Sequence, residues 1–214
     1  MWVDERWREK FSRFLRNKSD IATVGKQLIE ELKDKYNITV KVIRCDNMVE
    51  NKSLEKELSG KNIKFEYTAS GTPQQNGVVE RAFATLYNRI RSMMYSAGIG
   101  KEMRKKLWAE CAQTAILIDN LLIYNGNKSF YDRLGTEQPR FILNMRQFGE
   151  VGIVLNQKIR NISSKMDNKG LTCIFTGYSL QHRTGVYRMF NLQTQKNYCD
   201  ERYFMNEFDI WTIH

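Results

Sequence analysis

The spacing of apolar residues predicts helices and strands in alternation along the first half of the chain. Residues 21–36 carry apolar side chains at helical intervals, directly after the potential capping residues Ser19 and Asp20. Aromatic residues before this helix indicate a strand near residues 10–15. A β-branched run at residues 38–45 predicts another strand, which ends in a turn at an Asp-Asn pair.

The pattern continues with one more strand and three helices. A short helix is expected at residues 52–59 and a strand at residues 63–68. From Val79 the apolar residues form a one-sided stripe, which predicts the clearest helix of the chain. A second long helix, well buried, is expected at residues 101–124. Residues 126–147, with two glycines and a proline, are interpreted as a linker.

The pattern changes after Phe148, where short strand-like runs alternate with glycine, asparagine and lysine clusters. These runs are VGIVL, LTCIFTGYS, GVYRMFNL and KNYCDERYF. Several short strands at such spacing predict a small antiparallel barrel or sandwich. The predicted organisation is therefore an α/β core at residues 1–125 and a β-rich domain at residues 148–210.

Composition adds a strong positive charge to this picture. The 214 residues include 34 lysines and arginines against 24 acidic residues, a net charge of +10. Such a surplus favours a polyanionic partner, most simply nucleic acid, although it also fits a role in solubility alone. The four cysteines are never spaced as a zinc site requires, which favours reduced thiols in an intracellular protein. No apolar run is long enough for a transmembrane helix.

Two carboxylates lie at positions where α/β proteins commonly have ligand-binding or catalytic residues. Asp46 follows a predicted strand, and Glu80 lies in the first turn of the helix that follows the polar loop TPQQNG. Ligands gather at the carboxyl ends of strands in open α/β sheets, and carboxylates hold the divalent ions of phosphoryl transfer. From the residues alone, two other readings stay open: Asp46 as a turn residue and Glu80 as a complement to the helix dipole.

Several segments together resemble the integrases of copia-type (Pseudoviridae-like) LTR retrotransposons, which belong to the RNase H-like DDE polynucleotidyl transferases. The matching segments, in chain order, are VDERWREKFSRFLRNKSD, IRCDN, YTASGTPQQNGVVER, LWAECAQTAILIDNL, KMDNKGLTCIFTGYS, YRMFN and FMNEF. The last three resemble the SH3-like β domain that follows the integrase core in Pol polyproteins of this family.

The resemblance implies a fold and a metal site. It implies an α/β RNase H-like core with an N-terminally truncated mixed sheet, followed by a small SH3-like barrel. It makes Asp46 and Glu80 catalytic residues and ligands of Mg²⁺ or Mn²⁺. The family's first catalytic aspartate lies on a strand that precedes Met1, whereas Asp4 aligns with the end of the second strand. We therefore expect a chain without strand-transfer activity of its own.

The resemblance also implies partners. These are DNA, as retrotransposon cDNA ends and target DNA, and further copies of the chain, since active relatives assemble as multimers in the nucleus. The residues expected to contact nucleic acid are Gln74, Gln75, Asn76, Arg81 and Arg91. A non-catalytic nucleic-acid-binding or scaffold module is the alternative, and an RNase H-like nuclease is a third reading.

Two departures from the family pattern affect these expectations. Met48 and Val49 stand where relatives have glycines, so the turn after Asp46 has to differ or to be strained. After Glu80, residues 82–84 are Ala-Phe-Ala, which reduces the set of basic side chains that could face phosphates. Both departures are typical of a decaying or truncated element.

Overall fold

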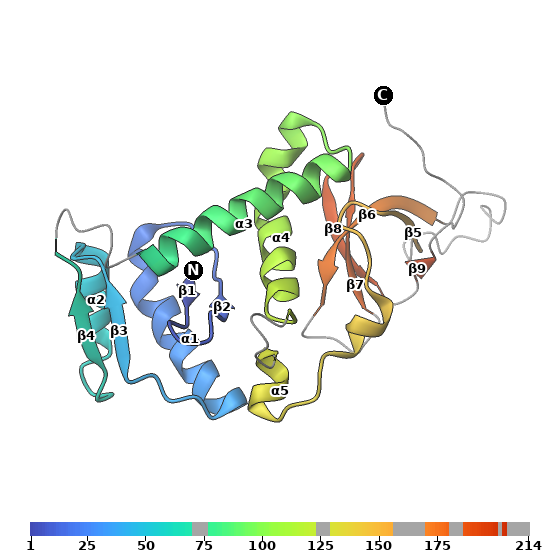
Figure 1. Ribbon diagram of the computed structural model, residues 1–214. Coiled ribbons are helices and arrows are strands. Elements are labelled where there is room, and N and C mark those ends of the chain that lie inside the picture. The colour runs from blue at the N-terminus through green and yellow to red at the C-terminus, as the bar shows by residue number, and fades with distance from the viewer. Residues whose placement is uncertain (70–76, 123–128, 156–169, 180–185, 201–202, 205–214) are drawn as a thin grey trace, which may run out of the picture. The chain divides into compact units, whose positions relative to one another are not determined.

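The computed structural model describes residues 1–69, 77–122, 129–155, 170–179, 186–200 and 203–204 (Figure 1). The chain divides into two compact units, Met1–Thr85 and Leu86–His214, which are described separately. In the described residues no helix combines the length and apolarity that crossing a membrane requires.

The first unit begins with a small antiparallel hairpin. Strand β1 (Trp2–Val3) pairs with β2 (Lys10–Phe11), which is shorter than the strand predicted at residues 10–15. A 3-10 turn, η1 (Lys18–Asp20), then leads into helix α1 (Ile21–Tyr36), whose predicted bounds are confirmed. Asp20 makes no side-chain cap to α1; its carboxylate instead accepts the Asn17 backbone N–H at 3.2 Å.

A parallel β-α-β unit follows and positions Asp46. Strand β3 (Val42–Cys45) pairs in parallel with β4 (Lys64–Tyr67), and helix α2 (Val49–Glu57) connects them. Strand β3 is shorter than predicted because Ile38 belongs to the end of α1: its N–H donates to the Leu32 carbonyl at 3.0 Å. The carboxyl ends of both strands lie at the same edge of this two-stranded sheet, as a parallel pair requires.

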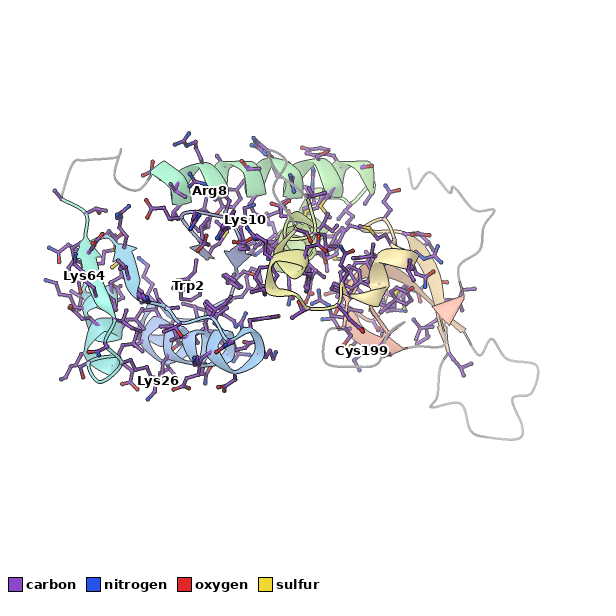
Figure 2. The ribbon with its side chains drawn as sticks, turned by 60° about the horizontal axis from the view of Figure 1, so that its bottom comes forward. Trp2, Arg8, Lys10, Lys26, Lys64 and Cys199 are labelled. Atoms are coloured by element: carbon purple, nitrogen blue, oxygen red, sulfur yellow. The ribbon has the colours of Figure 1, made fainter. Side chains whose placement is uncertain are left out.

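Helices α1 and α2 pack closely to form the core of the first unit. The buried residues at this contact are Leu28, Leu32, Leu54 and Leu58. Gly25 makes the close approach possible, because a Cβ there would lie 2.7 Å from Leu54 Cδ1. The ion pair Lys26–Glu57 joins the two helices at 2.9 Å, and Lys61, which follows α2, pairs with Glu30 of α1 at 2.7 Å; Figure 2 labels Lys26.

Two long helices come next along the chain. Helix α3 (Gly77–Ser96) has the predicted apolar stripe, with Leu86, Ile90 and Met94 buried. Helix α4 (Lys101–Asp119) ends five residues before the predicted end. The segment interpreted as a linker contains a short helix α5 (Phe130–Leu134) and a 3-10 helix η3 (Arg140–Asn144).

The second unit contains a five-stranded antiparallel sheet in the order β8-β7-β6-β5-β9. The strands are β5 (Val151–Leu155), β6 (Gly170–Tyr178), β7 (Tyr187–Asn191), β8 (Lys196–Asp200) and β9 (Tyr203–Phe204). Cα atoms of β5 and β8 approach within 8 Å. In a flat sheet these strands would lie about 14 Å apart, so the sheet is strongly curled. The mixed helix-and-sheet class is confirmed, whereas the RNase H-like and SH3-like assignments stay predictions.

Helix α4 is fastened to this sheet at an irregularity in β6. The pairing of β6 with β7 shifts between Phe175 and Gly177, and Gly177 has φ +151°. The Thr114 hydroxyl of α4 donates to the Thr176 carbonyl at 2.9 Å. Arg188 of β7 donates to Gln113 at 2.8 Å and also pairs with Glu110 of α4. Helix and sheet are therefore tied together within the second unit.

Candidate functional site

Asp46 lies directly after β3, at the sheet edge where the sequence predicted it. Its carboxylate is partly buried, and Oδ1 accepts a hydrogen bond from Asn51 Nδ2 at 2.6 Å. The same amide donates to the Asp46 carbonyl at 3.2 Å. Asn51 belongs to the first turn of α2, so the helix start fixes the rotamer of the candidate ligand.

The turn after Asp46 differs from a glycine turn and is not strained. Met48 has extended dihedrals, φ −81° and ψ 154°, and Val49 begins helix α2. Positive φ is absent at both positions, which removes the need for glycine. The expectation of a different turn is therefore confirmed.

The partly buried Cys45 thiol precedes Asp46, and Glu55 links it electrostatically to the Tyr67 hydroxyl. The Tyr67 hydroxyl donates to Glu55 Oε2 at 2.6 Å. Desolvation, followed by this hydrogen bond, raises the pKa of Tyr67 to about 12. Desolvation, followed by the charges of Asp46 and Glu55, raises the pKa of the Cys45 thiol to about 11. Both shifts keep the thiol and the phenol in their neutral forms at neutral pH.

Glu80 lies in the first turn of α3 with its side chain exposed. Ala84, Tyr87 and Arg91 are exposed on the same face of the helix. The sequence placed Glu80 on the flank of the apolar stripe, at about 100° per residue. The structure shows that this flank faces solvent, because the buried side is narrow and consists of Ala82, Leu86, Ile90 and Met94.

The described residues do not form a two-metal centre. Within them, no group of three or more His, Cys, Asp or Glu side chains could hold a metal ion. No hydrogen bond or ion pair between described residues joins Asp46 to Glu80. The Asp4 carboxylate lies in the β1–β2 turn, where it accepts the Trp7 N–H at 2.5 Å. Two-metal chemistry needs more ligands than these.

The residues predicted to contact nucleic acid have mixed outcomes. Gln74, Gln75 and Asn76 lie outside the described residues. Arg81 is exposed and donates to the Gly77 carbonyl at 3.2 Å, and Arg91 is exposed and donates to Asn88. Their roles stay predictions. Arg89, by contrast, forms an ion pair with the buried Asp119 and holds α3 to α4.

Sequence reasoning missed an exposed aromatic surface on α3 and α4. Tyr87 and Tyr95 have 52% and 68% of their surface exposed, and Trp108 has 47%. Arg104 lies over the Tyr95 ring, 4.1 Å from its centroid. The signal was present in the spacing, since Tyr87, Arg91 and Tyr95 recur every four residues beside the buried row Leu86, Ile90 and Met94.

Comparisons with known proteins find a similarity to a retrotransposon Pol polyprotein. It is similar to the Retrovirus-related Pol polyprotein from transposon TNT 1-94 of Nicotiana tabacum, with 28% identity over 180 residues. The match covers 83% of this chain but 13% of that polyprotein. The resemblance to a copia-type Pol polyprotein is thereby confirmed. No family model matches the chain.

One solved structure is similar over most of the chain. It comes from the cryo-EM structure of the simian T-cell lymphotropic virus intasome in complex with the PP2A regulatory subunit B56 gamma. The TM-score is 0.48 at 12% identity, and the match covers 92% of this chain and 67% of that one.

Proposed function

We propose that the chain is a segment of a copia-type retrotransposon integrase, whose parent activity is DNA integration. The proposal is carried by the similarity to a retrotransposon Pol polyprotein over 180 residues. The local geometry supports it: Asp46 follows a parallel strand, and Glu80 lies in the first turn of a helix entered from a polar loop. These are the positions that the resemblance assigns to the second and third catalytic acids.

The segment by itself is expected to bind DNA without joining it. The net charge of +10 and the exposed Arg81 and Arg91 suit phosphate contacts. The described carboxylates do not complete a site for Mg²⁺ or Mn²⁺, so no metal-dependent step is assigned to them. Multimers with DNA in the nucleus, and an RNase H-like core with an SH3-like barrel, belong to this proposal as properties of the parent integrase.

A second candidate is a non-catalytic nucleic-acid-binding or scaffold module. The contact between Asn51 and Asp46 favours it, because it engages one oxygen of the candidate ligand in the β3–α2 connection. In this case Asp46 acts as a turn residue. An Asp46→Asn change, which keeps an acceptor oxygen for Asn51, would then leave the stability of the chain unchanged, whereas Asp46→Ala would lower it.

Two measurements on the full chain test the proposal. Affinity for duplex DNA should fall steeply between low and physiological salt, since phosphate contacts release counterions. Affinity that is independent of salt would count against phosphate-led binding. In the second measurement, the chain is incubated with Mn²⁺ and model cDNA ends. We expect no joined product, and Glu80→Gln is the matched control. A joined product that is lost in Glu80→Gln would contradict the expectation that the chain alone does not join DNA.

A further inference from the structure

A surface in the second unit combines aromatic rings with positive charge. We call it the tyrosine face and define it as Tyr87, Arg91 and Tyr95 of α3 with Arg104 and Trp108 of α4. Tyr95 and Arg104 are in direct contact, with the guanidinium 4.1 Å from the ring centroid. Trp108 follows Arg104 by one helical turn and so lies on the same side of α4.

The helix geometry sets the spacing of the rings. Tyr87 and Tyr95 are eight residues apart on α3, which corresponds to about 12 Å along the axis at 1.5 Å per residue. Arg91 lies midway between them on the same face. Stacked nucleotides rise about 3.4 Å each, so the distance between the rings matches roughly three to four nucleotides of one strand.

The charges on this part of the molecule are mainly positive. Helix α4 begins with a basic run, and its one acid in the first turn, Glu102, is paired with Lys105 at 3.0 Å. Arg91 donates to the neutral Asn88, so its charge is not neutralised by that contact. An acidic ligand would thus find both cations and ring faces on adjacent side chains.

Together these features favour a nucleic-acid ligand whose base faces are accessible. Exposed aromatic rings that gather in one patch mark interaction sites, and the Tyr95 ring also attracts the Arg104 guanidinium. A duplex buries its base faces and offers only phosphates and groove edges. A single strand offers phosphates and base faces at once, the combination that aromatic platforms with basic residues recognise.

We propose that the tyrosine face binds single-stranded nucleic acid, with bases stacked on Tyr87, Tyr95 and Trp108 and phosphates held by Arg91 and Arg104. This inference rests on the proposed function for the class of partner and adds the form of nucleic acid that the surface selects. Stacking tolerates any base, so we expect little sequence preference.

The test is fluorescence anisotropy of the full chain with a short labelled oligothymidylate and with a duplex of equal length. We expect Tyr95→Ala and Tyr95→Leu to weaken oligothymidylate binding by about tenfold, the effect of losing one stacked base. Tyr95→Trp should restore binding because it keeps a ring. Duplex affinity should change by less than about twofold in all three variants, since phosphate contacts remain.

A matched control comes from the first unit, where Arg6 lies 4.6 Å from the centroid of the Trp7 ring. Trp7→Ala removes a similar cation–aromatic pair outside the tyrosine face and should leave oligothymidylate affinity unchanged. Equal circular dichroism spectra and melting temperatures establish that each variant is folded.

Three results would overturn the inference. They are wild-type affinity of Tyr95→Leu for the single strand, an equal loss in duplex binding, and an equal effect of Trp7→Ala. Binding of a polyglutamate peptide as tight as that of oligothymidylate, and insensitive to Tyr95, would point to an acidic protein partner instead. Each of these outcomes leaves salt-dependent duplex binding, and with it the proposed function, intact.

Discussion

Gly177 offers the sharpest stability test, because two effects meet at this residue. Its φ of +151° lies in a region that L side chains rarely adopt. A Cβ at this position would also lie 2.6 Å from Thr114 Oγ1 and clash with the Arg188 guanidinium. Gly177→Ala therefore has to shift either the backbone of β6 or the side chains that fasten α4 to the sheet.

The magnitude follows from these two effects. Backbone strain of this kind costs about 1–3 kcal/mol. Displacing Thr114 and Arg188 weakens the hydrogen bonds to Thr176 and Gln113, each worth about 1 kcal/mol. We expect a loss of roughly 3–5 kcal/mol, which is a large part of the 5–15 kcal/mol that stabilises an ordinary domain.

The assay is urea unfolding of the full chain, followed by far-ultraviolet circular dichroism, with Gly98→Ala as the control. Gly98 also has positive φ, +64°, but a Cβ there would meet no atom within 4 Å. We expect Gly98→Ala to cost about 1 kcal/mol, from strain alone. A double variant, Gly177→Ala with Arg188→Ala, should lose less than the sum of its single variants, because the clash with the guanidinium is gone. If Gly177→Ala is no more destabilising than Gly98→Ala, the close contact with α4 is refuted.

Three further predictions concern buried groups. Leu54→Ala should destabilise the first unit by about 2–5 kcal/mol in the same assay, since Leu54 is 2% exposed between α1 and α2; a smaller loss for Leu122→Ala, at an exposed site, is the control. Thr114→Val should cost about 1–3 kcal/mol by leaving the Thr176 carbonyl without its donor, while Thr114→Ser should be nearly neutral; equal losses would contradict this reading. Burial raises the pKa of the Cys111 thiol to about 12, so at pH 8 it should react with a thiol reagent far more slowly than the exposed Cys199. Because the folded-state pKa is the higher one, the associated stability is present below about pH 9 and is lost as the pH rises toward 12.

The sequence predicted most elements, but several of their ends and their strand registers differ from what the pattern indicated. Helix α1 was predicted to the residue because its apolar spacing stops where Asn37 adopts a left-handed cap. The strand before Asp46 was predicted to begin too early. Ile38 is β-branched, as strand residues often are, but its N–H donates a backbone hydrogen bond to Leu32 at the end of α1. The strand–helix–strand order of residues 38–68 is typical of a parallel pair, but the register of β3 against β4 is decided by contacts between distant segments that no local pattern contains.

The sequence predicted where the candidate site residues lie along the elements, but it did not predict which side chains contact them. Asp46 is at a strand end and Glu80 in a first helical turn, as the motifs indicated. Asn51 was missed because an amide five residues from a carboxylate carries no signal until the β3–α2 connection brings the two within 2.6 Å. The exposed tyrosines carry no apolar periodicity of their own, so the pattern that predicted the buried side of α3 gave no sign of them.

Two arginines on α3 show why the number of basic residues in a sequence does not by itself identify a binding surface. Arg89 and Arg91 are two residues apart, and at about 100° per residue they therefore lie on nearly opposite sides of the helix. Arg89 is directed to the α4 side, where the buried Asp119 neutralises it. Arg91 is exposed beside Tyr87 and Tyr95. Removing Arg89 would take its guanidinium away from the buried Asp119 and lower stability, whereas removing Arg91 should lower affinity for nucleic acid and leave the fold unchanged. The composition counts the two arginines equally, and only their opposite positions on α3 separate a structural charge from one that can reach a ligand.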